Sequence, residues 1–215
     1  MGYLPETLRN YLAKLGWGHG DDEIFSDDQA IAWFDIKDVV SAPARLDWAK
    51  LNHLNNHYIR QAEPARLAAL VVKILESRDV RLKQGDEALI ARTIPFVRDG
   101  AKTTLELADA VLFVLKTRPL EIPEKTLAQL DAEMRGRIGR LRAALGAAAS
   151  WDVPGLEAAL REFSTAEGIG MGKFGPQLRA ILAGGASAPD LAGTMTALGR
   201  DESLGRIDDA LSLPA

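Results

Sequence analysis

Several hydrogen-bond donors and one aromatic ring stand together at the end of a helix predicted in the stretch PARLDWAKLNHLNNHYIR, residues 43–60. Asp47 can cap this helix, and the apolar residues that follow recur at helical spacing on one face. Arg60 supplies a fork of donors and Tyr58 a stacking face, which suits contact with a phosphate backbone or a sugar. The same residues would also form an ordinary solvated helix end, so their chemistry alone leaves both interpretations open.

A glycine-rich run, GIGMGKFG at residues 168–175, superficially imitates a phosphate-binding loop. A nucleotide-binding P-loop needs a preceding strand and a Ser or Thr directly after its Lys, whereas Phe174 follows Lys173 here. A dinucleotide fingerprint needs a βαβ unit, which the helical surroundings do not provide. We therefore expect a loop that leads into a helix near Pro176, whose N-terminal amides and Lys173 could meet an RNA phosphate.

Other polar patterns predict no catalytic or metal site. His53 and His57 have the spacing of a two-histidine metal site, but no third ligand stands at useful spacing and the chain has no Cys. Three His and no Cys also leave no nucleophile, base and acid constellation. The densest basic cluster favours a solvated face over a phosphate track. It comprises Arg135, Arg137, Arg140 and Arg142.

The composition is that of a soluble globular protein, with 26% charged and 47% hydrophobic residues in a chain of 215. No apolar run approaches the roughly 20 residues that span a bilayer, and no leader opens the chain, so we expect a cytoplasmic protein without a membrane partner. The net charge of -4 argues against a generic binder of nucleic acid, and no DNA partner is expected. Residues 61–150 nevertheless carry 15 basic and 12 acidic side chains, which permits RNA binding without requiring it.

Helical periods and caps dominate the chain, and no convincing strand alternation appears after residue 60. Pro5 opens a first helix that Gly16 ends, and Ser26 with Gln29 forms a capping box. Thr103 with Glu106 predicts a second capping box. Later helices are expected at 86–95 with Pro95 at a kink or end, 127–145, 151–167 with Ser150 as cap, 176–183, 189–198 and 203–211.

The expected fold is mainly α, built as helical bundles. The first sixty residues read as short helices around irregular connections, and from residue 63 the helices lengthen. The stretch TRPLEIP at 117–123 has two prolines and no helical period, which indicates a domain junction. We therefore predict three domains, at residues 1–62, 63–122 and 123–215.

Three segments of the chain resemble bacterial glutamyl-tRNA synthetases, in the order that family has them. GYLPETLRNYLAKLGW with DDEIFS resembles the family just downstream of its Lys-Met-Ser-Lys-Ser loop. The order Asp-x-x-Lys-Leu-x-x-Leu-Asn-x-x-Tyr-Ile-Arg resembles the segment after the catalytic lobe, and PQLRAILAGG followed by APDL resembles the distal anticodon-binding part. The resemblance covers essentially the whole chain and implies a stem-contact domain followed by two helical-bundle anticodon-binding domains.

The resemblance implies a tRNA partner and assigns candidate contacts. The counterpart of Arg179 faces the anticodon loop, and Pro189 and Leu191 match neighbours that pack on anticodon bases, whereas Ala183 and Ala188 stand where members often carry a hydroxyl residue. Splayed anticodon bases are read by stacking and edge hydrogen bonds. The expected RNA-binding residues are Arg45, Tyr58, Arg60, Arg98, Gly100, Lys102, Lys173, Arg179, Pro189 and Leu191.

Gly100 departs from the pattern of discriminating family members. An Arg near this point reads the third anticodon base and separates glutamate tRNA from glutamine tRNA in those members. Arg98 and Lys102 stand two residues to either side, so a small shift of the alignment would restore a basic residue. With Gly100 at that position, the hypothesis is weak or redirected discrimination, with glutamine tRNA as a further partner.

The family's chemistry is not expected in this chain. Activation of glutamate with ATP uses a His-Ile-Gly-His-type motif and the Lys-rich signature loop, and neither motif occurs in the sequence. We expect no cofactor here, with ATP and Mg bound only by a catalytic domain that these residues lack. The chain alone should be an inactive monomer that binds tRNA; the alternatives are a helical protein-interaction scaffold and a free-standing regulatory RNA-binding relative.

Overall fold

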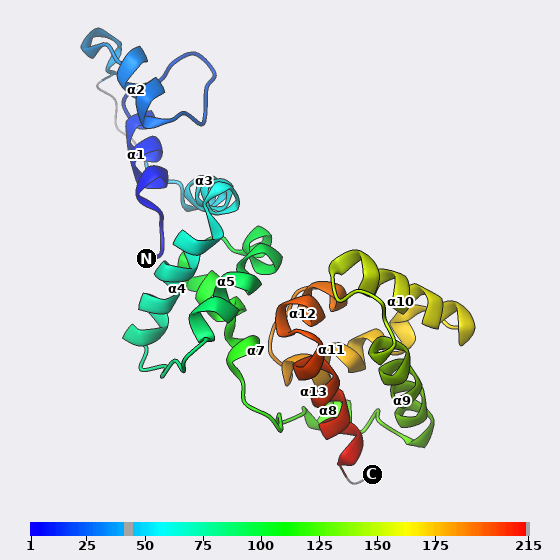
Figure 1. The fold of residues 1–215 in the computed structure, drawn as a ribbon. Coiled ribbons are helices and arrows are strands. Elements are labelled where there is room, and N and C mark those ends of the chain that lie inside the picture. Colours follow the sequence, from blue (N-terminus) through cyan, green and yellow to red (C-terminus); the bar gives the residue numbers. More distant parts are fainter. Residues whose placement is uncertain (41–44, 214–215) are drawn as a thin grey trace. The chain divides into compact units, whose positions relative to one another are not determined.

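The described residues, 1–40 and 45–213 of a computed structural model, form helices and loops with no strand among them (Figure 1). The predicted mainly α fold is confirmed. The helices of the first half are α1 (Pro5–Lys14), α2 (Asp27–Trp33), η1 (Ile36–Asp38), α3 (Trp48–Gln61), α4 (Pro64–Ser77), α5 (Asp86–Val97), η2 (Arg98–Gly100), α6 (Thr104–Ala110) and α7 (Leu112–Leu115). Those of the second half are α8 (Glu124–Leu127), α9 (Ala132–Gly146), α10 (Val153–Ala166), η3 (Met171–Lys173), α11 (Gly175–Ala183), α12 (Leu191–Leu198) and α13 (Arg200–Ser212). None of the described helices is long and apolar enough to cross a bilayer.

The chain folds as two compact units. Unit 1 holds residues 1–81 and 98–109, and unit 2 holds residues 82–97 and 110–215. Residues 63–122, expected as one domain, thus contribute α4 to unit 1 and α5 and α7 to unit 2. The predicted junction at 117–123 lies within unit 2, and the three-domain division stays a prediction.

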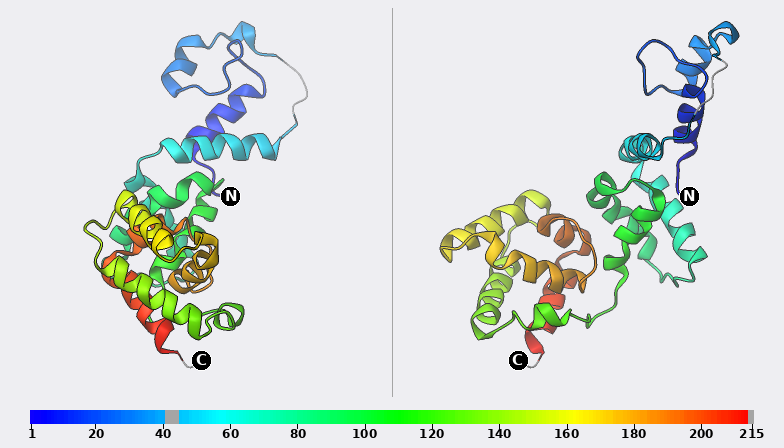
Figure 2. Two further views of the ribbon diagram at one scale, coloured as in Figure 1. Left: turned by 90° about the vertical axis from the view of Figure 1, so that its right-hand side faces the viewer. Right: turned by 180° about the vertical axis from the view of Figure 1, so that it is seen from behind.

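In unit 1, α1 packs against α3, as Figures 1 and 2 show. Pro5 lies in the first turn of α1, where its missing N–H costs no hydrogen bond. Asp47 caps α3 as predicted, since its carboxylate accepts from the amides of Ala49 and Lys50. The apolar faces of the two helices meet at Tyr11, Leu51 and Leu54, which are buried together.

One amide side chain of α3 connects three segments of unit 1. The Asn55 Oδ1 atom accepts from the Leu4 amide at 2.9 Å and from the Thr7 hydroxyl at 2.8 Å. Its Nδ2 atom donates to the Lys102 carbonyl at 2.6 Å and to the Gly2 carbonyl at 3.3 Å. Asn55 is fully buried, so these bonds fix the chain start and residue 102 against α3.

In unit 2, α12 packs against α5, α10 and α11, and α9 packs against α13 and α10. Buried Ile138, Leu141 and Leu145 form the inner stripe of α9. Aspartates cap three of these helices, and an N-cap carboxylate satisfies amides that the first helical turn leaves without partners. The capping aspartates are Asp131 of α9, Asp152 of α10 and Asp190 of α12.

A buried arginine of α13 ties three helices of unit 2 together. The Arg206 guanidinium donates to the carbonyls of Phe113, Leu182 and Lys116 and pairs with Glu202 at 2.6 Å. The residue is 2% exposed, and burial lowers the pKa of Arg206. Because each of its three guanidinium nitrogens donates to an acceptor, the charge can be accommodated inside the unit.

Some helix ends differ from the expected ones. The helix expected over 127–145 begins only at Ala132, because Asp131 caps it and residues 124–127 form the separate α8. Ser150 does not cap α10; Asp152 does, by accepting from the Gly155 amide at 2.9 Å. The capping box at Ser26 is confirmed. At Thr103, the hydroxyl accepts from the Glu106 amide, but the Glu106 carboxylate accepts from Lys102 instead of Thr103.

Candidate nucleic-acid interface

A cavity of about 400 Å³ opens on unit 2 where α10 meets η3, α11 and the start of α12. Its apolar lining lies beside four charged side chains, two of each sign. The lining residues are Glu157, Leu160, Arg161, Ser164, Met171, Arg179, Asp190, Leu191 and Ala192.

The structure places two of the predicted RNA-binding residues, Arg179 and Leu191, on this cavity. Arg179 is exposed on α11, and Leu191 is the buried first residue of α12, held there by the Asp190 cap. Lys173 is exposed in η3, which also contributes Met171 to the lining. Pro189 is half-buried just before the Asp190 cap, and its carbonyl accepts from the Thr194 hydroxyl at 3.3 Å.

The two arginines of unit 2 that have no partner in the described structure both lie at this cavity. Eight of the ten arginines in unit 2 use their guanidinium groups in ion pairs or hydrogen bonds. The other two, Arg161 and Arg179, hold neither within the described residues, and both line the cavity. Unpaired guanidinium groups remain available to bind phosphate in bidentate geometry.

Sequence reasoning missed the α10 side of the cavity. Glu157, Arg161 and Ser164 all come from α10, where no motif marks them. The Ser164 hydroxyl is buried and has no hydrogen-bond partner in the described structure. A buried polar group without a partner is costly, so a ligand that supplied one would gain from it.

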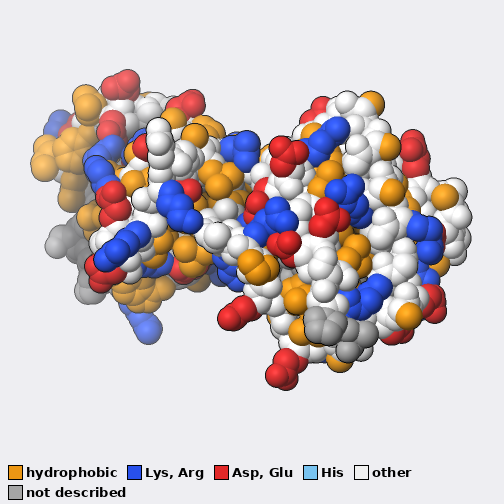
Figure 3. Space-filling view, turned by 60° about the horizontal axis from the view of Figure 1, so that its bottom comes forward, with side chains coloured by type: hydrophobic (Ala, Val, Ile, Leu, Met, Phe, Trp, Pro, Cys, Tyr) orange, Lys and Arg blue, Asp and Glu red, His pale blue; other side chains and the backbone are white. Residues whose placement is uncertain are grey.

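The arginine cluster of α9, in contrast, is committed to internal contacts. Arg140 forms two bonds with Glu167 at 2.6 and 2.7 Å, and this carboxylate raises the pKa of Arg140. Arg142 pairs in the same way with Asp208, and Arg137 with Glu133. On the face shown in Figure 3, basic and acidic side chains accordingly lie interspersed, without one large basic field.

In unit 1 the structure joins two predicted stretches that lie about forty residues apart in the sequence. Asn56 of α3 donates to the carbonyls of Asp99 and Ala101 at 3.1 and 2.7 Å. The Arg60 Nε atom lies 3.2 Å from the Asp99 carboxylate, and both side chains are more than half exposed. The end of α3 and residues 98–102 therefore form one polar cluster.

The predicted RNA-binding residues of that cluster differ in how far they are exposed and free to contact a ligand. Arg98 is half-buried and donates to the Ala62 carbonyl at 3.4 Å. Gly100 and Lys102 are exposed, and a Cβ atom added at Gly100 would meet nothing within 4 Å. Arg45 is also exposed, although residues 43 and 44 of the same stretch lie outside the described residues.

Tyr58 has its hydroxyl engaged inside unit 1. It donates toward Asn10 Oδ1 at 2.8 Å and the Phe25 carbonyl at 3.1 Å, and the ring packs on the core around Leu51 and Leu54. Burial raises the pKa of Tyr58. Only the partly exposed ring face remains for any RNA contact, and that role of Tyr58 stays a prediction.

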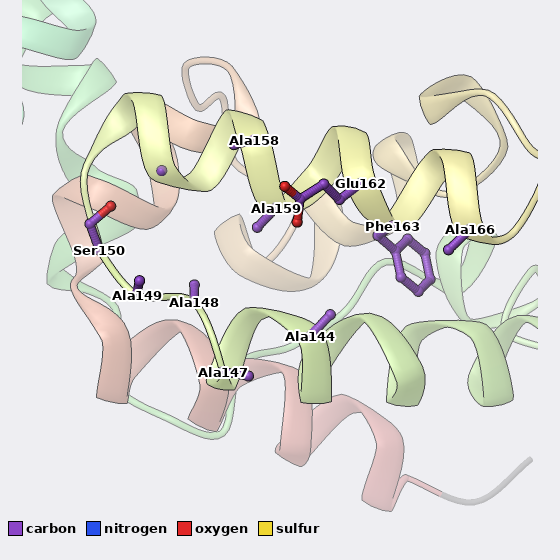
Figure 4. A pocket seen from close by; sticks show the side chains of 11 residues that line it. Ala144, Ala147, Ala148, Ala149, Ser150, Ala158, Ala159, Glu162, Phe163 and Ala166 are labelled. Atoms are coloured by element: carbon purple, nitrogen blue, oxygen red, sulfur yellow. The ribbon is translucent and has the colours of Figure 1, made fainter.

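A second cavity of unit 2, of about 530 Å³, has a different chemistry (Figure 4). Side chains of α9 and α10 face each other across it, most of them alanines, and Glu162 is its only charged lining residue. Without a basic group it offers nothing to a phosphate. No group of three or more metal-ligating residues comes together anywhere in residues 1–40 and 45–213.

Comparison with known proteins assigns the chain to a family. The family model described as "Anticodon binding domain" matches residues 60–211. The chain belongs to the anticodon-binding domain family. The match contains the unit 2 cavity and the residues 98–102, and it leaves out α1 and α2.

Relatives of this anticodon-binding chain are glutamate–tRNA ligases. It is 78% identical to the ligase of Phenylobacterium zucineum and 58% identical to that of Caulobacter vibrioides, each over 212 residues and 99% of this chain. The chain spans 45% of the length of each of these relatives. The resemblance to bacterial glutamyl-tRNA synthetases predicted from the sequence is confirmed.

Solved structures agree with that relationship. A glutamate–tRNA ligase from Elizabethkingia meningosepticum matches 98% of this anticodon-binding chain with a TM-score of 0.78 and 26% identity. A glutamate–tRNA synthetase from Elizabethkingia anophelis matches 99% with a TM-score of 0.76 and 26% identity. In each case the matched region is 41% of the larger chain.

Proposed function

We propose that this chain is the tRNA-binding part of a glutamate–tRNA ligase. The observation that carries the proposal is the pair of unpartnered arginines, Arg161 and Arg179, on one cavity inside the anticodon-binding match. Anticodon bases unstack from their loop, and proteins read them by apolar or aromatic packing and by hydrogen bonds to their edges. The cavity receives such a base against Leu160 and Leu191, while the two guanidinium groups bind the flanking phosphates.

The α10 side chains give the cavity a means of reading the base. Glu157 carries no ion pair within the described residues and presents an acceptor, which favours a base with an exocyclic amine. Ser164 presents a hydroxyl that lacks a partner in the described structure. Arg161 and Arg179 stand on opposite helices and hold the backbone while those groups meet the base edge.

The chain acts by positioning the tRNA for the reaction of the ligase. Glutamate–tRNA ligases similar to it are more than twice as long, so the ATP-dependent step belongs to a catalytic part outside these residues, which binds ATP and Mg. The cluster of Arg60, Arg98 and Lys102 in unit 1, with Arg45, supplies further contacts to the tRNA backbone.

Gly100 leaves the third anticodon base without an arginine contact, so discrimination against glutamine tRNA is relaxed. Action as a monomer in the cytoplasm belongs to the same proposal.

Measurement of tRNA affinity in matched arginine variants tests the proposal. Transcribed glutamate tRNA is titrated with the chain, with the double variant Arg161→Gln/Arg179→Gln, and with the control Arg140→Gln/Arg142→Gln. The control also removes two arginines of unit 2, the exposed Arg140 and the half-buried Arg142, but ones that already hold carboxylates. We expect the first double variant to weaken binding at least tenfold and the control to change it less than threefold. Equal losses in both, or no binding by the native chain, would refute the proposal.

A further inference from the structure

A third cavity of unit 2, of about 670 Å³, lies at the other end of α12 from the cavity of Arg161 and Arg179. Leu191, the first residue of α12, lines the one cavity, and Leu198, the last residue, lines the other. The start of α5, the end of α7 with the residues after it, and Glu202 of α13 complete the wall of the third cavity. Its volume is typical of sites that bind small molecules.

The wall of this cavity carries more basic than acidic side chains. The two cavities of unit 2 described above differ from it, because one has two charges of each sign and the other has only Glu162. The excess of basic groups stands in a chain whose net charge is -4, so the overall composition does not account for it. The charged lining residues are Lys83, Arg92, Lys116, Arg118, Asp86 and Glu202.

Two of these six charges are neutralised within unit 2. Arg118 donates to both carboxylate oxygens of Asp209 at 2.8 Å, and the Glu202 carboxylate accepts from the buried Arg206 at 2.6 Å. Opposite charges in such close contact cancel at the distance of a neighbouring ligand. The charge that the cavity presents to a ligand therefore depends on the other four side chains.

Two lysines of the wall keep their charge although hydrogen bonds hold both in place. The Lys83 Nζ atom donates to the Thr117 hydroxyl at 2.9 Å, and the Lys116 Nζ atom donates to the Gly184 carbonyl at 2.8 Å. Both acceptors are neutral, and neither lysine pairs with a carboxylate in the described structure. Because an ammonium group has three N–H donors, each lysine retains donors for a ligand.

Arg92 adds a third cation without a carboxylate partner in the described residues. Its Nε and Nη2 atoms donate to the carbonyls of Ala197 and Leu198 at 2.9 and 3.3 Å, and its Nη1 atom stays available. The one remaining acid, Asp86, accepts from the Lys83 backbone amide at 2.7 Å. Three such cations against one carboxylate leave an excess of two positive charges on the wall.

A ligand with linked phosphate groups matches this charge and this volume. A phosphate group carries about −1.5 to −2 charge near pH 7 and offers three acceptor oxygens. We propose that the cavity binds a small ligand with two linked phosphate groups, held by Lys83, Arg92 and Lys116. Leu89 and Leu115, which also line the cavity, give the organic part of such a ligand an apolar surface.

The arrangement of the three cations suits a small ligand better than an RNA backbone. Hydrogen bonds to the fold fix all three on the wall of one cavity, and fixed donors lower the entropic cost of binding a compact ligand. An RNA strand spreads its phosphates along a surface and is bound by basic groups that follow the strand. The inference does not rest on the proposed function, whose evidence is the cavity of Arg161 and Arg179.

Calorimetric titration of the 215-residue chain with inorganic pyrophosphate tests the site. The buffer contains no divalent metal and about 150 mM salt, which screens weak contacts between exposed charges. Lys83→Gln/Lys116→Gln removes two of the three cations. Lys125→Gln/Lys173→Gln is the matched control, because both of its lysines are exposed in unit 2 and neither lines this cavity.

We expect pyrophosphate to bind the native chain at least fivefold more tightly than inorganic phosphate does. Lys83→Gln/Lys116→Gln should weaken pyrophosphate binding at least tenfold, and the control should change it less than twofold. No binding by the native chain, or equal losses in the two lysine variants, would overturn the proposal.

The Arg161→Gln/Arg179→Gln variant shows whether the probe enters the other cavity instead. It should bind pyrophosphate within twofold of the native chain. Loss of pyrophosphate binding in this variant would place the probe between those two arginines and contradict the proposal.

Affinity for transcribed glutamate tRNA separates the small ligand from RNA. Lys83→Gln/Lys116→Gln should bind this tRNA within threefold of the native chain. A loss of tenfold or more would assign the two lysines to the RNA backbone, and the proposal would fail. The test of the proposed function uses other residues, so the failure of one proposal is distinguishable from the failure of the other.

A measurement on the native chain covers the case in which the lysine variant fails to fold. Pyrophosphate is added to the isotope-labelled chain, and the backbone amide signals are followed by NMR. The largest shifts are expected at Gly85 and Thr117, which line the cavity, with Gly172 of η3 unchanged. Largest shifts in residues 168–179 would exclude the proposed site.

Discussion

Arg161 of α10 and Arg179 of α11 line the same cavity although eighteen residues separate them in the sequence, and neither pairs with an acid in the described structure. Every other arginine of unit 2 has found a carboxylate or a carbonyl. Two unpaired guanidinium groups that face one site repel each other modestly in water, and an anion between them removes that repulsion. The pair therefore favours a ligand that places an anionic group between the two arginines, as the proposed contact with tRNA phosphates requires.

The salt dependence of tRNA binding should report these two arginines directly. Each phosphate contact releases a counterion, which contributes a slope of about −0.7 to −0.9 to the logarithm of the binding constant against the logarithm of salt concentration. Arg161→Gln/Arg179→Gln should make the slope shallower by about 1 for each arginine. Binding titrations at salt concentrations between about 50 and 200 mM measure this slope. A slope identical to that of the native chain would mean that neither side chain contacts a phosphate.

Gly100→Arg should sharpen discrimination at the third anticodon base. A side chain can be added there without displacing a neighbour, because a Cβ atom meets nothing within 4 Å. The added guanidinium should favour the cognate base by about tenfold, or about 1.4 kcal/mol, over tRNAs that differ only at that base. Gly139→Arg, at an equally open position of unit 2, is the control and should leave the ratio unchanged. A native chain that already shows a tenfold preference would contradict relaxed discrimination.

Loss of the buried arginine of α13 should destabilise unit 2 strongly. Arg206→Met leaves three carbonyls without their donor and Glu202 without its partner, which should cost about 3–5 kcal/mol of the free energy of unfolding. Arg118→Met removes an arginine that also contacts α13, through an exposed pair with Asp209, and should cost at most about 1 kcal/mol. Urea unfolding of both variants measures the difference. Similar midpoints would show that Arg206 is not the structural tie described above.

Acid should weaken unit 1 through Glu6. Two bonds from Arg66, at 2.7 and 3.0 Å, hold the pKa of Glu6 below its usual 4.5. A carboxylate with a lowered pKa in the folded state stabilises the fold above its unfolded pKa, and this stability is lost as the pH falls through the folded value. Glu6→Gln should therefore lower the free energy of unfolding by up to about 1 kcal/mol at pH 7. It should also make the free energy of unfolding fall less steeply below pH 4.5. Glu87→Gln, at an exposed position without an ion pair in the described residues, should change neither; an unaltered pH profile for Glu6→Gln would exclude this role.

Local signals in the sequence predicted the helices and two of their caps. Ser26 and Asp47 cap the helices that their spacing indicated, because capping depends only on residues two or three positions away. The predicted start of α9 at Leu127 is wrong. The apolar spacing from Leu127 onward runs on into the helix without a break, whereas the Asp131 cap sets the start at Ala132.

The candidate site was predictable on one side only. Arg179 and Leu191 stand in a stretch with a family resemblance, whereas Arg161 and Ser164 reach the cavity only through the packing of α10 on η3 and α12. Tyr58 is a predicted RNA-binding residue whose hydroxyl is already engaged within the fold. It donates to Asn10, forty-eight residues away in the sequence. Contacts between residues so far apart in the sequence cannot be predicted from the spacing of residue types.

The buried Asn55 side chain has a consequence for changes at the amino-terminal end of unit 1. The same carboxamide bonds to Gly2, Leu4 and the Lys102 carbonyl, and the Gly2 carbonyl also accepts from the Thr104 amide at 2.9 Å, so the first residues help to hold the backbone around residue 102 on α3. Trimming a few amino-terminal residues would therefore loosen the loop around Gly100, which lies a hundred positions downstream. Any fusion or tag placed ahead of Gly2 is for that reason also a change to the loop that the proposed function places next to the tRNA.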